Sequence, residues 1–217
     1  MTDPMLTIFR KSTLTLLMFL SLFTASISAA EQPSKQPLFF YVFIHDDIPS
    51  HKRESLRKDY FAWLLKDLEG FTGRRIYLEF IEHRAPLTGF RYQGEDLNST
   101  LNDWTQQVND YRISKNLPNN IRGKYLLLTY NNINEYTLGV TRLKHHAGIA
   151  SLGTYPAAAH EIGHMLGGTH EAAEILYKGG WWCETNLTAT RFSLRANCYH
   201  YSDKNKQAIA AYLSESP

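Results

Sequence analysis

The chain has few cysteines, almost no excess of charge of either sign, and no repeated or low-complexity segment. Only two of its 217 residues are cysteine, and 23 basic against 21 acidic side chains give a formal net charge of +2. So small a net charge gives no support to binding of nucleic acid or of an anionic membrane surface. Hydrophobic residues make up 43%, which is enough for a packed core and argues against disorder. The length fits one domain.

An apolar run long enough to cross a membrane is also missing. Arg10 and Lys11 precede an uncharged stretch, and its strongly apolar part, residues 14–23, is shorter than the roughly 20 residues of a spanning helix. Small residues follow up to Ala30. This order predicts a signal peptide over residues 1–30 that is cleaved on secretion, to a periplasm or to the exterior, and leaves no stable membrane association. An uncleaved anchor is the alternative.

Both cysteines, Cys183 and Cys198, lie beyond the predicted signal peptide. In an exported chain two nearby cysteines most simply form a disulfide. The loop of about 15 residues that they would close corresponds to roughly 3 kcal/mol of stabilisation. The alternative, two free thiols as zinc ligands, is weaker because their spacing resembles no common zinc finger.

Apolar periodicity predicts strands that alternate with helices, and hence an α/β fold with a largely parallel sheet. The strands are expected at residues 38–44, 76–81 and 125–130, with weaker candidates at 136–143 and 148–152. One helix is expected from Pro49 to Gly70, a second from Asp96 to just before Pro118, and a last one after the N-cap Ser202. Residues 179–196 show no period and are predicted to be irregular structure held by the disulfide.

One short segment carries a metal-binding pattern. His160 and His164 are four residues apart, so on a helix they face the same side. Glu161 can reach a water on the metal without being a ligand. Gly167 lets the backbone leave the helix and bring His170 round as a third ligand. Three protein ligands leave one tetrahedral position open, as in catalytic zinc sites, so the pattern predicts one catalytic Zn²⁺ ion. Histidines hydrogen-bonded inside a buried helix, and a purely structural zinc, are the alternatives.

This spacing, His-Glu-x-x-His-x-x-Gly-x-x-His, resembles the elongated zinc motif of the metzincin clan of metallopeptidases. The resemblance implies a zincin-like α/β fold within one catalytic domain, residues 31–217. A twisted mixed sheet with helices would form the N-terminal subdomain, about 37–167. A small irregular C-terminal subdomain, about 168–217, would end in a helix. In the clan an edge strand before the active-site helix binds substrate in extended form, and residues 148–152 occupy that position. His145 and His146, just upstream, are expected to be loop residues rather than extra ligands.

The sequence departs from the clan in lacking any methionine after Met165. The clan has a methionine-containing turn below the metal, and by resemblance Tyr199 stands where that methionine is expected. Tyr201 would then match a tyrosine that in some members, such as the astacins, stabilises the transition state. Packing of Tyr201 in the core is the alternative.

The predicted function is that of a secreted, monomeric zinc endopeptidase that binds a protein or peptide in extended form. Zinc would activate a water, Glu161 would act as general base, and Tyr201 would donate to the oxyanion. Two alternatives stay open. One is a catalytically impaired zinc-binding relative that serves as a binding protein. The other is a zinc hydrolase of a non-protein or cell-wall amide.

Overall fold

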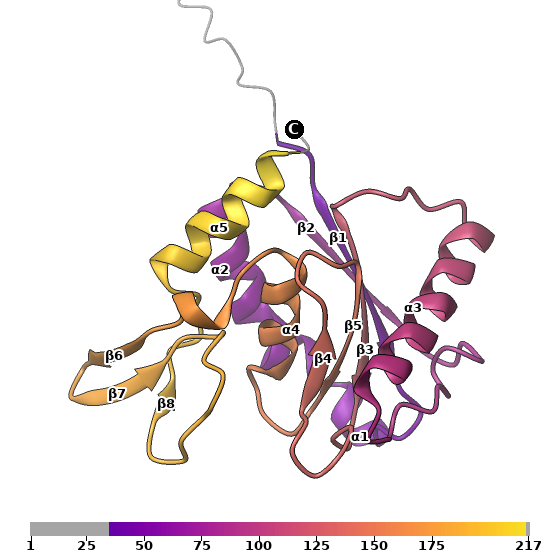
Figure 1. Cartoon of the computed structure of the whole chain (residues 1–217), viewed down its shortest axis with the longest axis horizontal. Coiled ribbons are helices and arrows are strands. Elements are labelled where there is room, and N and C mark those ends of the chain that lie inside the picture. Colours follow the sequence, from indigo (N-terminus) through magenta and orange to yellow (C-terminus); the bar gives the residue numbers. More distant parts are fainter. Residues whose placement is uncertain (1–34, 216–217) are drawn as a thin grey trace, which may run out of the picture. The chain divides into compact units, whose positions relative to one another are not determined.

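The computed structural model describes residues 35–215, so the predicted signal peptide lies outside the described residues. A five-stranded sheet has helices on both faces, and residues 175–197 contain a separate three-stranded sheet, at the lower left of Figure 1. The mixed α/β fold expected from the alternating pattern is confirmed. Within residues 35–215 no helix is long and apolar enough to cross a membrane.

The large sheet is parallel except at one edge. Its strand order is β2-β1-β3-β5-β4, with β1 at Leu38–Ile44, β2 at Ile76–Ile81, β3 at Gly123–Thr129, β4 at Gly139–Thr141 and β5 at Ala147–Ser151. Strands β2, β1, β3 and β5 run parallel to one another, and β4 runs antiparallel to β5. The central strand β3 is buried along its whole length, as its continuous apolar run predicts.

The position of β4 corrects one expectation. Residues 148–152 were predicted to form the edge that binds substrate, but β5 pairs with β3 on one side and with β4 on the other. The edge is therefore β4. The weaker strand candidate at residues 136–143 contains β4, but only three half-buried residues pair there, and a sequence pattern does not say which of two neighbouring strands lies at the edge.

Two layers of helices cover the large sheet. One face is covered by α2 (Ala62–Thr72), α4 (Ala157–Met165) and α5 (Asp203–Ser214), and the other by α3 (Leu97–Ser114) (Figure 1). The short segments α1 (Ser50–Arg53) and η2 (Arg57–Phe61) lead into α2. The helix predicted to stop at Gly70 continues to Thr72, where Gly73 closes it in a left-handed conformation with φ +64°. The predicted N-cap Ser202 is confirmed, since its hydroxyl accepts from the backbone N–H of Asn205.

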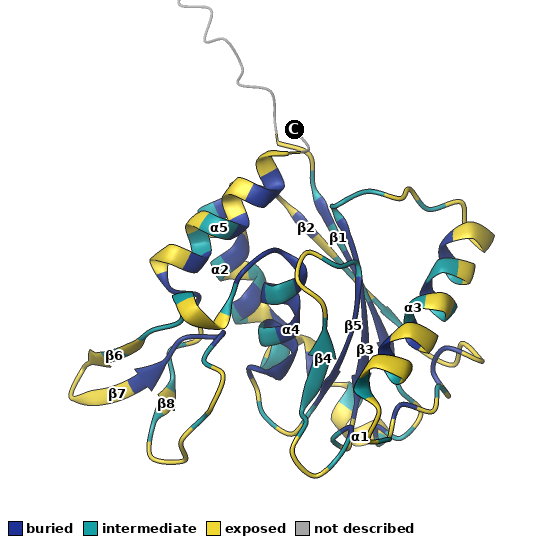
Figure 2. Ribbon diagram, in the orientation of Figure 1, coloured by how far each residue is buried: buried dark blue, intermediate teal, exposed yellow. Residues whose placement is uncertain are grey.

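The segment predicted to be irregular contains a second sheet. It is formed by β6 (Ile175–Lys178), β7 (Trp181–Glu184) and β8 (Ala196–Asn197). The predicted disulfide between Cys183 and Cys198 is present and ties β7 to the residue after β8. Most residues of β6 and β7 are exposed (Figure 2). Exposed and buried residues do not alternate along these strands, so no period of two was present to predict them.

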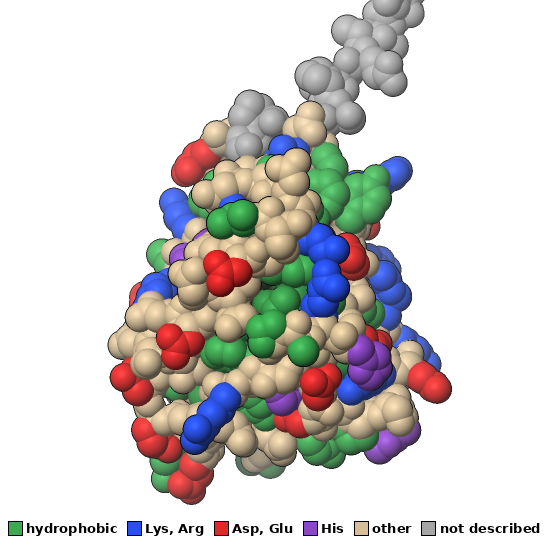
Figure 3. Space-filling model, turned by 90° about the vertical axis from the view of Figure 1, so that its right-hand side faces the viewer, with side chains coloured by type: hydrophobic (Ala, Val, Ile, Leu, Met, Phe, Trp, Pro, Cys, Tyr) green, Lys and Arg blue, Asp and Glu red, His purple; other side chains and the backbone are tan. Residues whose placement is uncertain are grey.

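Charges are mixed on the molecular surface that carries α3. Figure 3 views the molecule from the right-hand side of Figure 1, and basic and acidic side chains are interspersed there rather than gathered by sign. This distribution agrees with the small net charge of +2.

Candidate metal centre

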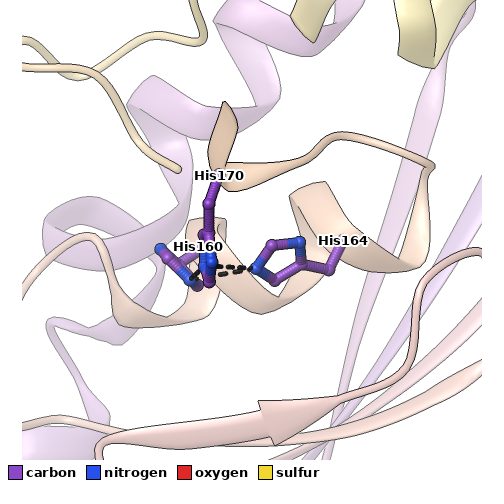
Figure 4. A group of neighbouring side chains, drawn as sticks. All are labelled: His160, His164 and His170. Carbon is purple, nitrogen blue, oxygen red and sulfur yellow. Dashed lines mark hydrogen bonds between the residues drawn. The ribbon is translucent and has the colours of Figure 1, made fainter. Parts of the chain in front are cut away.

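Three histidines converge at the C-terminal half of α4. The Nε2 atoms of His160 and His164 lie 3.1 Å apart, and each lies 2.9 Å from Nε2 of His170 (Figure 4). Among residues 35–215 these three form the group of potential metal ligands whose donor atoms come together. The helical spacing of four residues places the first two rings on one face of α4.

A tight turn at the end of α4 brings the third ring into place. Gly167 has φ +95°, a backbone conformation that residues other than glycine rarely adopt. Its N–H donates to His164 O at 2.9 Å, and the N–H of Gly168 donates to Gly163 O at 2.8 Å. These two bonds form a Schellman motif, which ends a helix and reverses its backbone. The chain then returns toward the helix and places His170 beside the other two rings.

Asn205 of α5 holds the returning segment. Its side chain is fully buried and is bonded on both sides of Thr169, accepting from the N–H at 2.9 Å and donating to the carbonyl at 3.1 Å. A paired contact of this kind fixes the extended backbone at Thr169, immediately before His170. The last helix therefore determines where the third histidine lies, and the sequence motif alone did not reveal that role.

The hydrogen bonds of the outer ring nitrogens fix the protonation of two rings. Nδ1 of His160 lies 2.9 Å from Asn186 O, and Nδ1 of His164 lies 2.9 Å from Gly168 O. A carbonyl accepts only, so each Nδ1 carries the proton and each neutral ring turns an Nε2 lone pair toward the other. Burial, reinforced by the neighbouring histidines His164 and His170, lowers the pKa of His160 to about 3 and keeps that ring neutral.

This arrangement fits a metal ion. Two lone pairs that face each other at 3.1 Å repel unless a cation lies between them. The nitrogen ligands of a tetrahedral zinc ion lie about 3.3 Å apart, given zinc–nitrogen distances of about 2.0–2.1 Å. Carbonyl acceptors on the outer nitrogens are the usual companions of metal-binding imidazoles. The three-histidine cluster therefore indicates a zinc site.

Glu161 lies between α4 and the edge strand. Its side chain is buried, and burial raises the pKa of its carboxyl to about 8 in the absence of a cation. A methyl group built on Gly139 of β4 would lie 2.6 Å from Oε1 and 2.8 Å from Cγ of Glu161. The carboxyl group thus lies against the bare backbone of β4. Glycine at this position is what gives it room.

A cleft of about 200 Å³ opens beside these groups. One wall consists of residues 136–139, which lead into β4, and the floor includes His160 and Glu161. The cleft is also lined by Thr188, Ala189 and Arg191 of the loop between β7 and β8. The cleft therefore places the carboxyl group and one metal-site histidine between a strand edge and a loop.

Neither tyrosine lies where the resemblance placed it. Tyr201 is fully buried, its hydroxyl donates to Ala159 O at 2.6 Å, and its ring packs beneath α4 at Gly163. This arrangement favours the core-packing alternative for Tyr201. Tyr199, expected below the metal, is 41% exposed and packs edge-on against Trp63. Tyr201, two residues later, is the side chain that supports the helix.

The upstream histidines are apart from the cluster. Nε2 of His146 lies 3.1 Å from Asn109 Oδ1, and Nδ1 of His145 lies near Ala147 O. Neither belongs to the group of converging metal ligands in the described part of the chain. Their place in the turn before β5 agrees with the expected loop role.

Comparison with known proteins supports the fold. No family model matches the chain, and no curated protein does. Metalloproteinase-II from Bacteroides fragilis superposes with a TM-score of 0.58 at 18% identity, over 84% of this chain and 55% of that one. The chain shares its fold with a metalloproteinase. It spans about half the length of that protein, so the likeness concerns the fold alone.

A second solved structure is more distant. The zinc-dependent peptidase from Methanocorpusculum labreanum matches with a TM-score of 0.47 at 16% identity, over 78% of this chain and 99% of that one. The metallopeptidase fold of the present chain rests on the first of these two comparisons.

Proposed function

We propose that the chain is a secreted, zinc-dependent endopeptidase of the metzincin type, with residues 31–217 as its catalytic domain. The observation that carries the proposal is the convergence of three Nε2 atoms, two of them on rings whose Nδ1 atoms already donate to carbonyls. Nitrogen lone pairs that converge in this way form the ligand set of a metal cation. Three ligands leave the fourth position open, whereas structural zinc sites fill all four. The adjacent Glu161 can act on a water at that open position.

The proposed ligands are His160, His164 and His170, holding one ion. Bound zinc would supply Lewis-acid polarisation of the scissile carbonyl and a lower pKa for water at the open position. Glu161 is the proposed general base, which takes the proton of the attacking water and returns it to the leaving amine. Packing of its side chain against Gly139 of β4 keeps the carboxyl group beside both the cleft and the metal site.

The edge strand β4 is the proposed docking site for substrate. Its inner side pairs with β5, which leaves the outer backbone groups of Gly139–Thr141 available to an extended peptide. The same strand borders Glu161 through Gly139. A peptide added to this edge would therefore run past the carboxyl group.

Tyr201 is proposed as a support for α4 rather than as an oxyanion donor. Its hydroxyl already donates to Ala159 O, and its ring is fully buried beneath the helix. The disulfide is compatible with an extracellular location. Secretion through a signal peptide at residues 1–30, to a periplasm or to the exterior, and a monomeric state complete the proposal.

The decisive experiment compares the exported protein with its Glu161→Ala variant on an unbiased peptide library, with the cuts mapped by mass spectrometry. We expect wild type to cut and the variant to be inactive while it retains one zinc ion, because Glu161 is not a ligand. Cutting by the variant would contradict the role of Glu161. A folded, zinc-loaded wild type that cuts no peptide would instead favour a binding protein or a hydrolase of another amide.

A further inference from the structure

The loop between β7 and β8 contributes a positive charge to the cleft. Arg191 lines the cleft together with His160 and Glu161. The other residues of this loop that line the cleft are Thr188 and Ala189, which are uncharged. The part of this loop that lines the cleft therefore carries one cation and no anion.

Arg191 is held in place by groups behind it. Its Nη2 donates to Asn197 Oδ1, and its Nε lies 3.7 Å from Glu184 Oε2. Glu184 is 1% exposed and follows the disulfide-bonded Cys183 on β7. A side chain fixed in this way presents its charge at a defined position instead of extending freely into solvent.

The buried carboxylate does not neutralise its surroundings. Glu184 faces two cations, since Arg195 Nη1 also donates to its Oε1 at 3.2 Å. One negative and two positive charges leave a net charge of +1 around Glu184. A guanidinium has five N–H donors, and within residues 35–215 the hydrogen bond to Asn197 is the one that Arg191 makes. The guanidinium, which lines the cleft, therefore keeps N–H donors that make no hydrogen bond within these residues.

We propose that Arg191 is a specificity-determining residue that binds a carboxylate of the substrate within the cleft. The inference rests on the proposed function, because it concerns selection among peptides cut at the same metal centre. A guanidinium suits this role because it binds a carboxylate with two parallel hydrogen bonds. The carboxylate is either the side chain of an acidic residue near the scissile bond or the free C-terminus of a short peptide.

Matched peptide pairs test the proposal. One pair is blocked at both ends and carries Glu or Gln at each position around the cut. A second pair lacks acidic side chains and ends in a free carboxylate or an amide. We expect wild type to favour the carboxylate member of one pair by about 10- to 100-fold in kcat/KM, the usual worth of a charge-assisted hydrogen bond. The pair that shows the preference identifies the source of the carboxylate.

Arg195 provides the control. It contacts the same Glu184 but does not line the cleft. We expect Arg191→Gln to remove the preference, Arg191→Lys to restore part of it, and Arg195→Gln to keep it. A wild type without a preference, or an Arg191→Gln variant that keeps it, overturns the proposal. An equal loss in Arg195→Gln also overturns it, because the effect would then belong to the fold of the loop.

A binding measurement separates this inference from the proposed function. The same peptides are titrated calorimetrically onto zinc-loaded Glu161→Ala protein, where no cut is needed. Tighter binding of the carboxylate member, lost on adding Arg191→Gln, supports carboxylate recognition even if wild type cuts nothing. Equal binding of both members contradicts the role of Arg191, whether or not the peptides are cut.

Discussion

The two sheets of this protein keep their shape by different means. In the large sheet β3 is buried throughout, and the helices on either face add two layers of apolar core. In the small sheet Trp181 is 74% exposed and Trp182 is 54% exposed. That region is held by the disulfide and by the buried Glu184 with its arginines. Burial stabilises the first region, and covalent and ionic contacts stabilise the second.

The two regions contribute different residues to the proposed site. Glu161 and two of the three histidines lie on α4, which packs on the large sheet. Arg191, the candidate for substrate selection, lies in the loop of the small sheet. The residues proposed for hydrolysis thus lie mainly on the well-packed large-sheet region, and the residue proposed for peptide selection lies on the exposed small-sheet region. Changes in each region should affect activity differently.

The largest effect is expected from Gly139→Ala in the large sheet. The added methyl group would lie 2.6 Å from Glu161 Oε1 and 2.8 Å from Ile149 O, so the carboxyl group or the strand must move. A displacement of about 1 Å can lower a rate by about 10²-fold. We expect such a loss in kcat/KM with zinc content unchanged, measured on the peptides cut by wild type.

Gly70→Ala is the matched control, because nothing lies within 4 Å of its added methyl group. That variant should keep full activity. An active Gly139→Ala enzyme would show that the seat of Glu161 on β4 is unimportant and would weaken the division between the regions.

Removing the disulfide tests the small sheet. The double variant Cys183→Ser and Cys198→Ser should lower the free energy of unfolding by about 2–4 kcal/mol, since the cross-link restricts the unfolded chain. We also expect any preference for acidic peptides to weaken more than the zinc content, as Glu184 follows Cys183 in β7. Urea unfolding measures the change in stability. Cleavage of the matched peptide pairs and metal analysis measure the peptide preference and the zinc content. A double variant that loses zinc to the same extent as it loses peptide selectivity would contradict the proposed separation of the metal site from the small sheet.

Lys124 gives the large-sheet region an expected dependence on pH. Its buried Nζ donates to Met165 O at 2.7 Å, at the end of α4, and burial lowers its pKa to about 7. The unfolded chain keeps this proton up to about pH 10. Stability should therefore rise from pH 7 towards pH 9, by on the order of 1–2 kcal/mol.

The comparison of wild type with Lys124→Met isolates this contribution. Urea midpoints at pH 6.5 and pH 9 should differ more in wild type than in the variant. An identical difference in both proteins would show that Lys124 has an ordinary pKa in the folded state.

The smallest effect is expected from Tyr201→Phe. The change removes the hydrogen bond from the tyrosine hydroxyl to Ala159 O within α4, and such a bond contributes about 0.5–1.5 kcal/mol to stability. We expect kcat to change by less than about tenfold, in contrast to the roughly 10²–10³-fold loss of an oxyanion donor. A larger loss of kcat with zinc retained would return Tyr201 to the catalytic role that the resemblance implied.

The sequence by itself determined features that depend on local periods and short spacings. The helical repeat placed His160 and His164 on one face, Gly167 marked the turn to His170, and the apolar runs located β1 and β2 at the residues observed. The disulfide followed from having only two cysteines in a chain predicted to be exported. Each of these inferences uses residues close in sequence or a choice without competitors.

Only the tertiary structure decided which residues surround the motif. The carbonyl that orients His160 belongs to Asn186, and the edge strand that seats Glu161 is β4 rather than β5. The structure also decided that Tyr201, not Tyr199, supports α4. These contacts join segments more than 20 residues apart, and some involve backbone atoms common to every residue type. A pattern of side chains in sequence carries no record of them, because packing of separate elements creates them.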